Sequence, residues 1–239
     1  MSGPQCCENP PSLSSSSGDG AVVQLGGLNS YVSGPSDSKL AVLLASDIFG
    51  YEAPKLRKLA DKIGAAGFYV VVPDFFFGDP YDPSNTEKPL PVWLKFHGQD
   101  KGVEDAKPVV ADLISKGISA IGAAGFCWGA KVAVKLLASD HVQAAVLLHP
   151  SFVTVDDIKE VTKPIAILGA ELDQLTPPEL IKQFEAILAT KPEVDSFVKI
   201  FPGVSHGWTI RYNEENQKEV ESAEEAQQDM LAWFGKYVK

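Results

Sequence analysis

The chain has 239 residues, 45% of them hydrophobic, and a mean hydropathy close to zero, which is the composition of a soluble folded protein. Its length fits one large α/β domain. The 31 acidic and 21 basic residues give a formal charge of −10, which argues against nucleic acid and anionic membrane surfaces as partners.

The first twenty residues are rich in Ser, Pro and Gly, and they predict a flexible tail (1–20) ahead of the folded domain (21–239). They lack the charged and apolar regions of a secretory signal, and Ser2 stands where myristoylation requires glycine. The chain's cysteines, Cys6, Cys7 and Cys127, have neither the spacing of a disulfide framework nor that of a zinc site. We therefore expect a cytoplasmic protein in a reducing compartment, with Cys6 and Cys7 as incidental thiols of the tail.

From residue 21 onward, short apolar runs alternate with helical patterns. The apolar runs predict strands at 22–25, 31–32, 40–45, 68–72, 120–124, 144–148, 165–168 and 197–201. The helical patterns predict helices at 53–66, 103–116, 128–138 and 178–189, and a C-terminal helix with its apolar stripe between Val220 and Tyr237. This alternation predicts an α/β fold with a mainly parallel, doubly wound sheet and helices on both faces. The polar, Pro-rich stretch at 74–98 is interpreted as either a lid or a long ordered loop.

Ligands of such sheets bind beyond the carboxyl ends of the strands, and one predicted strand ends at a distinctive turn. The sequence Gly125-Phe126-Cys127-Trp128-Gly129 lies between a predicted strand and a predicted helix. It has the form of a nucleophile elbow, in which small flanking residues let strand and helix approach closely. The helix N-terminus favours a thiolate at Cys127, and the N–H of Trp128 points toward a developing oxyanion. The alternative is a buried structural cysteine in a Gly-rich turn.

A histidine and an acid complete the pattern, because this fold orders its triad as nucleophile, acid and histidine. His206 lies in a Gly-rich loop after the last predicted strand, where the base belongs. Asp173 follows the preceding strand and is the preferred acid, with Glu171 as its competitor. His141 is expected in a solvated turn, and His149 at a strand end is expected to be structural.

With these residues in view, the chain resembles the dienelactone hydrolase family of α/β-hydrolases, in its plant branch, from about residue 25 to the end. The elbow at 125–129, the Asp173 loop, Ser205-His206-Gly207-Trp208 and Ser46-Asp47-Ile48-Phe49-Gly50 match the family in order and context. The resemblance implies a Cys127–Asp173–His206 triad without metal or organic cofactor. It also implies an oxyanion hole formed by the N–H groups of Trp128 and Ile48.

The chain departs from the family in two ways, the first at the resting cysteine and the second at the substrate. Asp47 replaces a glutamate that contacts the resting cysteine in the family, and it is one methylene shorter. Of the two arginines that hold a substrate carboxylate in bacterial members, Arg211 can fill one place, and the other has no clear counterpart. Lys88 or Lys95 is the alternative for that place, but a lysine lacks the bidentate fork of arginine. Three consecutive phenylalanines at 75–77 suggest an apolar pocket wall and a less anionic substrate. Further expected lining residues are Tyr81, Trp128 and Trp208.

The sequence thus predicts a monomeric or homodimeric hydrolase that cleaves a small ester or lactone through a thioester intermediate. A glycoside hydrolase is one alternative, because some plant members of the family carry glucanase labels, but no facing pair of carboxylates is recognisable. A non-catalytic small-molecule receptor on a hydrolase fold is the other alternative.

Overall fold

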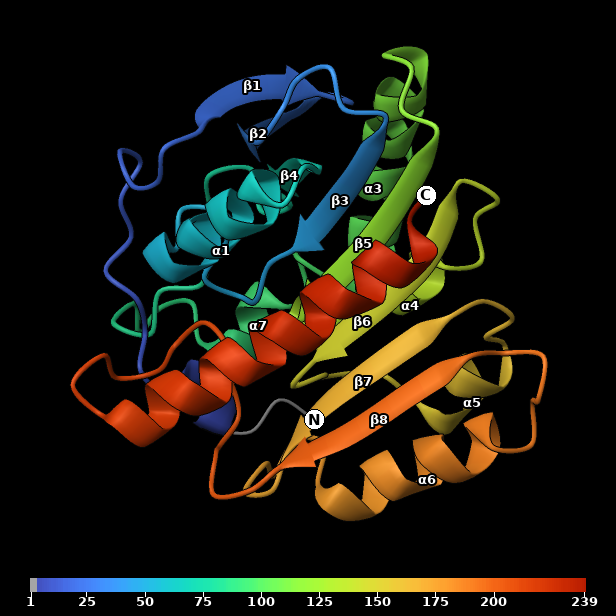
Figure 1. Ribbon diagram of the computed structural model, residues 1–239. Coiled ribbons are helices and arrows are strands. Elements are labelled where there is room, and N and C mark those ends of the chain that lie inside the picture. The colour runs from blue at the N-terminus through green and yellow to red at the C-terminus, as the bar shows by residue number, and fades with distance from the viewer. Residues whose placement is uncertain (1–3) are drawn as a thin grey trace.

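A single mixed sheet forms the centre of the protein in the computed structural model, which describes residues 4–239 (Figure 1). Residues 1–3, including Ser2 and the start of the predicted tail, lie outside the described residues. The strands are β1 (Ala21–Leu25), β2 (Leu28–Ser33), β3 (Leu40–Ala45), β4 (Tyr69–Pro73), β5 (Ala120–Phe126), β6 (Val142–Leu148), β7 (Ile165–Ala170) and β8 (Ser196–Phe201). Their order is β1-β2-β4-β3-β5-β6-β7-β8. Strands β3 to β8 run parallel to one another, and β2 pairs antiparallel with both of its neighbours, β1 and β4. The predicted fold class is confirmed.

Helices cover both faces of this sheet. They are α1 (Pro54–Ala65), α2 (Leu90–Trp93), α3 (Gln99–Ser115), α4 (Trp128–Leu136), α5 (Val155–Lys159), α6 (Pro178–Leu188) and α7 (Gln217–Tyr237). Apolar residues of α1 and α7 form one core with one face of the sheet, and those of α3 to α6 form a second core with the other. Along β3, Val42 and Leu44 belong to the first core and Leu43 to the second, as the alternation of a strand buried on both faces requires. Figure 1 shows α7 crossing in front of the central strands.

The short helices α2 and α5 are absent from the sequence-based expectation because four or five residues give too little periodicity to read. Their local chemistry nevertheless explains them. In α5 the Thr154 side chain accepts from the N–H of Asp157, and the Asp157 carboxylate accepts from the N–H of Thr154, which is a capping box.

The stretch 74–98 is an ordered segment that contains α2 and is hydrogen-bonded to Trp128, the first residue of α4. The indole Nε1 of Trp93 donates to the carbonyl of Asp79 (2.9 Å), and Nε1 of Trp128 donates to the carbonyl of His97 (2.9 Å). The ring of Phe76 meets that of Trp128 edge-on at 4.9 Å between centroids. Of the three phenylalanines expected in a pocket wall, Phe75 and Phe76 are buried, and Phe77 is exposed and lines a separate cavity.

The N-terminal arm, defined here as residues 4–20, packs against the domain, which differs from the predicted flexible tail. Its first turn is the 3₁₀ helix η1 (Pro4–Cys7), which lies beyond the arrowheads of the central strands (Figure 1). The buried guanidinium of Arg57 donates to the carbonyls of Ser15 (2.8 Å) and Ser17 (3.1 Å), and the N–H of Gly20 donates to the Tyr31 hydroxyl (2.7 Å). A buried guanidinium needs acceptors, and the carbonyls of the arm supply them.

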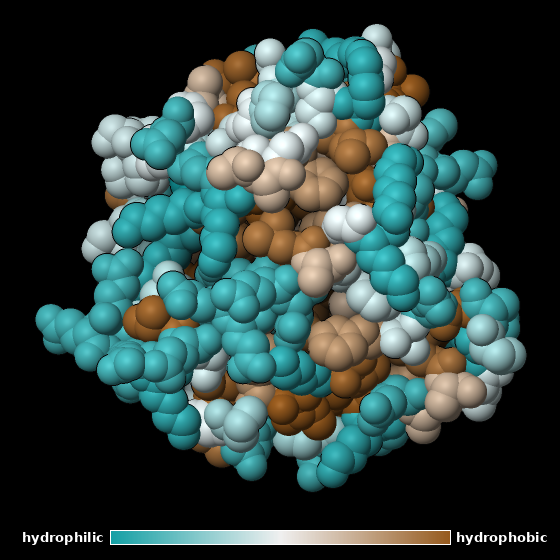
Figure 2. Space-filling view, in the orientation of Figure 1, coloured by the Kyte–Doolittle hydropathy of each residue, from teal (hydrophilic) through white to brown (hydrophobic). Residues whose placement is uncertain are grey.

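The surface carries the acidic and basic residues that the composition predicts. Figure 2 shows the face that includes α7 largely covered by hydrophilic side chains, with hydrophobic residues visible between them. Across residues 4–239, none of the helices combines the length and the apolar character needed to cross a membrane.

Candidate active site

Cys127 occupies a strained turn between the last residue of β5 and the first residue of α4. Its backbone angles are φ 51° and ψ −110°, a region that side-chain-bearing residues rarely adopt. A Cβ on Gly125 would lie 2.2 Å from the carbonyl oxygen of Gly129, and one on Gly129 would lie 2.0 Å from that of Ala45. The two glycines therefore permit the close approach of strand and helix that holds Cys127 in this conformation.

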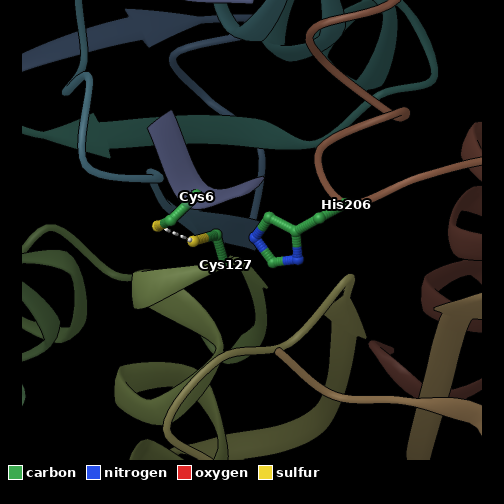
Figure 3. Close-up of side chains that lie close together, drawn as sticks. All are labelled: Cys6, Cys127 and His206. Carbon is green, nitrogen blue, oxygen red and sulfur yellow. Dashed lines mark hydrogen bonds between the residues drawn. The ribbon is translucent and has the colours of Figure 1, made fainter. Parts of the chain in front are cut away.

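The sulfur of Cys127 is fully buried and has two polar neighbours. It lies 3.4 Å from the hydroxyl of Ser151 and 3.2 Å from the sulfur of Cys6, which η1 brings to Cys127 (Figure 3). Sequence reasoning missed both neighbours. The adjacent pair Cys6-Cys7 was the only available signal, and nothing in the sequence directs the arm to this end of the sheet.

The carboxylate of Asp173 contacts the ring of His206. The Nδ1 of His206 lies 2.7 Å from one carboxylate oxygen of Asp173, and the other oxygen accepts from the N–H groups of Leu175 (2.8 Å) and Thr176 (3.2 Å). The carboxylate of Glu171 is exposed and accepts from the N–H of Gly203 instead. The structure thus brings Asp173, and not Glu171, to His206.

The second ring nitrogen of His206 faces the sulfurs. Figure 3 shows one nitrogen of the ring directed at Cys127, and since Nδ1 contacts Asp173 this nitrogen is Nε2. A ring nitrogen of His206 and the sulfurs of Cys6 and Cys127 all lie within 4.8 Å of one another. Within the described residues Nε2 has no hydrogen-bond partner, so it is free to exchange a proton with the thiol.

These contacts favour a thiolate at Cys127 and an imidazolium at His206. Burial opposes ionisation of Cys127, but the hydrogen bond from Cys6 and the positive charges of His206 and Arg211 hold its pKa well below the usual range. The hydrogen bond to Cys127 and burial raise the pKa of Cys6, so Cys6 is the protonated partner. Burial opposes the charged form of His206, yet the Cys127 charge and the Asp173 hydrogen bond raise its pKa to about 9.

Asp47 pairs with Arg211. One oxygen of Asp47 lies 3.2 Å from Nε of Arg211, and the other accepts from the N–H of Phe49 (3.0 Å). Burial raises the pKa of Asp47 to about 6, against the opposing charge of Arg211. The polar contacts of the shorter acid are therefore to Arg211 and the backbone, and not to the nucleophile.

Arg211 also holds the arm. Its Nη1 donates to the carbonyls of Cys6 (3.0 Å) and Glu8. Gly207 makes room for this side chain, because a Cβ there would lie 2.3 Å from Nη2 of Arg211. Nη2 is buried and has no partner among the described residues. Nη1 of the guanidinium is therefore engaged by backbone carbonyls of the arm.

The two predicted oxyanion donors have free N–H groups. Across the described residues, the N–H groups of Ile48 and Trp128 donate to no protein acceptor outside the helices and strands, and Trp128 is the first residue of α4, where an N–H lacks an intrahelical partner. The side chain of Trp128 is packed in the interior, so its contribution to the site is its backbone.

Tyr81 and Trp208 occupy different positions relative to the sulfur. The N–H of Tyr81 donates to the carbonyl of Ile48 (2.9 Å), which links it to the oxyanion loop. Trp208 packs against Phe201 and His149, with ring centroids 5.3 and 5.4 Å apart, in the core beneath α7. Trp208 thus packs against His149 in the core on one face of the sheet, whereas Cys127 belongs to the core on the other face.

The two remaining histidines after the elbow have the surroundings that the sequence predicts. His141 is exposed. His149 is fully buried, its Nε2 lies 2.8 Å from the hydroxyl of Thr209, and its ring centre lies 5.1 Å from that of His206. Burial and the nearby charges of His206 and Arg211 hold the pKa of His149 well below its usual range, so it is neutral beside the ion pair.

Cys6, Cys127 and His206 are also side chains of the type that bind zinc. An ion held by all three would occupy both the nucleophile and the nitrogen that must exchange its proton. Such binding would stop cysteine chemistry at this site rather than support it.

Comparisons with known proteins show which family the chain belongs to. Residues 28–238 match the model of the dienelactone hydrolase family. The chain is 45% identical over 196 residues to a Zea mays protein named endo-1,3;1,4-beta-D-glucanase, covering 80% of this chain and 63% of the maize protein. It is 34% identical to a carboxymethylenebutenolidase homolog from Xenopus tropicalis (92% of this chain, 91% of that one) and 30% identical to its human counterpart (92% of each).

Solved structures show the same fold. A putative dienelactone hydrolase from Klebsiella pneumoniae aligns with a TM-score of 0.73 at 22% identity, covering 88% of this chain and 93% of that one. The dienelactone hydrolase from Anabaena variabilis aligns with a TM-score of 0.65 at 17% identity, covering 92% and 97%.

Proposed function

Because the chain belongs to the dienelactone hydrolase family, we propose that it hydrolyses small carboxylic esters or lactones with Cys127 as nucleophile, His206 as general base and Asp173 as the residue that orients His206. The observation that carries this proposal is a cysteine on a strained elbow whose sulfur faces a histidine, while the other ring nitrogen of that histidine bonds a buried carboxylate.

In the first half of the reaction, the Cys127 thiolate attacks the carbonyl carbon of the ester or lactone. The oxygen becomes an oxyanion within reach of the N–H groups of Ile48 and Trp128. His206 then donates its proton to the alkoxide that leaves, and a thioester remains on Cys127. With a lactone the alkoxide stays attached to the acyl group.

In the second half, His206 must act as a base, although its pKa in the resting state is raised to about 9. Among the interactions that raise it, the charge of the Cys127 thiolate comes first. Acylation removes that charge, so the pKa of His206 falls and the imidazole can take a proton from water. The hydroxide releases the acid and regenerates the thiolate.

The charges near the site limit the substrate. The sequence contains two arginines, and Arg57 is engaged by the carbonyls of Tyr51, Ser15 and Ser17. Of the two arginines, only Arg211 then remains to bind an anion, and Asp47 already neutralises part of its charge. These observations support a neutral or singly anionic ester or lactone.

Access to Cys127 requires that η1 moves. The sulfur is fully buried, and the side chain of Cys6 fills the space where an acyl group would enter. A cleft of about 840 Å³ is lined by Asn9 to Ser12, which follow η1 in the arm, and by Arg211, which contacts η1 at Cys6. Displacement of η1 would join this cleft to the sulfur. The three free cysteines favour a reducing, cytoplasmic setting in which the thiolate persists.

The name of the maize relative gives the glucanase alternative its support. A glycosidase needs two carboxyl groups facing each other across the bond that is cleaved. The buried acids at this site are already committed, Asp173 to His206 and Asp47 to Arg211. The test is hydrolysis of mixed-linkage β-glucan by the wild type and by Cys127→Ser, because glucanase activity that survives the substitution would favour this alternative.

The experiment that tests the proposal is a screen of lactones and short esters with the reduced full-length protein beside Cys127→Ala. Cys7→Ser is the matched control, because Cys7 lies in the same arm and, among the described residues, has no hydrogen bond to Cys127. The proposal predicts turnover by the wild type and the control and none by Cys127→Ala. If the wild type turns over no short ester or lactone, the non-catalytic receptor replaces it.

A further inference from the structure

The thiols of Cys6 and Cys127 meet at the centre of the site, and no step of ester hydrolysis uses Cys6. We propose that the two cysteines form a reversible disulfide, in which Cys6 resolves an oxidised Cys127 and locks the arm over the active site. This inference rests on the proposed function only in taking Cys127 as the reactive thiolate.

The two side chains need to move little to form the disulfide. The two sulfurs lie 3.2 Å apart, and a disulfide bond is about 2.05 Å long, so closing it requires a shift of about 1.2 Å. Both residues are at most 1% exposed, so a second protein thiol cannot easily compete for Cys127. The proximity makes attack by Cys6 intramolecular and correspondingly fast.

The arm is docked by specific contacts, which keep Cys6 at this place. The buried amide of Gln5 donates to the carbonyl of Leu172 (2.9 Å) and accepts from the N–H of Gln174 (2.6 Å), on both sides of Asp173. Arg211 donates to the carbonyl of Cys6 itself (3.0 Å). Gln5 is thus hydrogen-bonded to the loop that carries Asp173. The backbone of Cys6 is hydrogen-bonded to Arg211, in the loop that follows His206.

The two thiols have the ionisation states that this chemistry requires. Cys127 is the thiolate, which is the form that hydroperoxides oxidise, and Cys6 is the protonated thiol. Cys127 attacks one oxygen of hydrogen peroxide, the O–O bond breaks, and the departing hydroxide takes the proton of His206 and leaves as water. Cys127 is then a sulfenic acid.

In the second step the sulfur of Cys6 attacks the sulfenic sulfur of Cys127. The S–S bond forms, the S–O bond breaks, and the hydroxide that leaves takes the proton of Cys6 as water. Overall, two thiol sulfurs are oxidised to one disulfide while one peroxide is reduced to two waters. A dithiol reverses the reaction by thiol–disulfide exchange and is itself oxidised to a disulfide.

The lock has two consequences for the protein. Acylation stops, because the nucleophile is consumed and η1 can no longer leave. The disulfide also keeps Cys127 from further oxidation to the sulfinic acid, which thiols do not reverse. Cys6 therefore converts oxidative damage at the active site into a recoverable state.

The test is peroxide treatment of the reduced full-length protein at neutral pH with a chelator present, so that a metal on the same atoms is not mistaken for oxidation. Free thiols are blocked with N-ethylmaleimide and tryptic peptides are analysed without reduction. Cys6 lies in the peptide 1–39 and Cys127 in the peptide 117–131, because Lys39, Lys116 and Lys131 bound them. We expect these two peptides to be cross-linked, and dithiothreitol to separate them.

Cys6→Ser and Cys7→Ser are the matched pair of variants. Cys7→Ser should cross-link like the wild type, which assigns the bond to Cys6. Cys6→Ser should give no cross-link, and with excess peroxide its Cys127 should gain the mass of a sulfinic acid. A wild type in which Cys127 is oxidised to the sulfinic acid without cross-linking, or a Cys6→Ser variant that cross-links equally, would overturn the proposal. The readout is a peptide mass and does not depend on esterase activity. The absence of esterase activity would therefore count only against the proposed function.

Discussion

The sulfur of Cys6 lies 3.2 Å from the sulfur of Cys127, although 121 positions separate the two residues in the chain. This contact explains how the thiol of Cys127 can have a lowered pKa and still be inaccessible. The arm supplies the hydrogen bond that favours the thiolate and, with the same side chain, covers it.

Weakening the arm should expose Cys127. Gln5→Ala removes two buried hydrogen bonds, each of which contributes about 1 kcal/mol, so alkylation of Cys127 by iodoacetamide should accelerate about tenfold or more. Glu8→Ala is the control. Glu8 is exposed and contacts Arg211 through its backbone carbonyl, which the substitution to alanine leaves in place. Equal alkylation rates for Gln5→Ala and the wild type would show that η1 does not govern access.

The ion pair should be visible in the titration of His206. Its pKa is raised to about 9, and the charge of Cys127 leads the interactions that raise it. In Cys127→Ser that charge is absent, so the His206 resonance in a pH titration by NMR should move at a lower pH than in the wild type. An unchanged His206 titration in Cys127→Ser would mean that Cys127 is a neutral thiol in the resting protein.

The same pair should flatten the pH dependence of stability. A raised pKa means that the His206 contribution to the free energy of unfolding is fully present below its ordinary pKa of 6.5 and is lost as the pH rises through about 9. A lowered pKa gives Cys127 a contribution that grows with pH and is fully present above its ordinary 9.0. Between pH 6.5 and 9 the two slopes oppose each other. Urea unfolding of the wild type should therefore vary little there, and a steep slope would count against the pair.

The strained elbow depends on its glycines. In Gly129→Ala the new methyl group would lie 2.0 Å from the carbonyl oxygen of Ala45, so the backbone must move, and we expect a loss of about 3 kcal/mol or more in unfolding free energy. Gly235→Ala in α7 is the control, because nothing lies within 4 Å of its Cβ. That helix position should gain about 0.5–1 kcal/mol. Similar denaturation midpoints for Gly129→Ala and the wild type would argue against a tight elbow.

Asp173 should matter for catalysis and Glu171 should not. Asp173→Asn leaves the shape of the loop but no longer fixes the tautomer of His206, so kcat/KM should fall about 10²- to 10⁴-fold. Glu171→Gln alters an exposed acid that contacts only the backbone N–H of Gly203 and should retain activity. If Glu171→Gln lowered kcat/KM in an ester assay and Asp173→Asn did not, Glu171 would be the residue that orients His206.

The sequence predicts those features that depend on local pattern. The buried strands, the helices with clear periodicity and the Gly-flanked Cys127 turn each carry their signal within a few residues, and the structure confirms the fold that they define. The position of Cys6 depends instead on contacts made with Leu172, Gln174 and Arg211, which lie more than 160 positions away. A tail rich in Ser and Pro gives no periodicity from which such docking can be read. Trp208 is a lining residue in the sequence-based expectation, and in the structure its ring packs against that of His149.

The most direct test of the account is to trap the acyl group. The reduced full-length protein is mixed with p-nitrophenyl acetate, quenched in acid and digested with trypsin. The account predicts a burst of p-nitrophenol and one acetyl group on the peptide 117–131 at Cys127, both absent in Cys127→Ala. A burst of equal size in Cys127→Ala, or an acetyl group on a different residue, would contradict it.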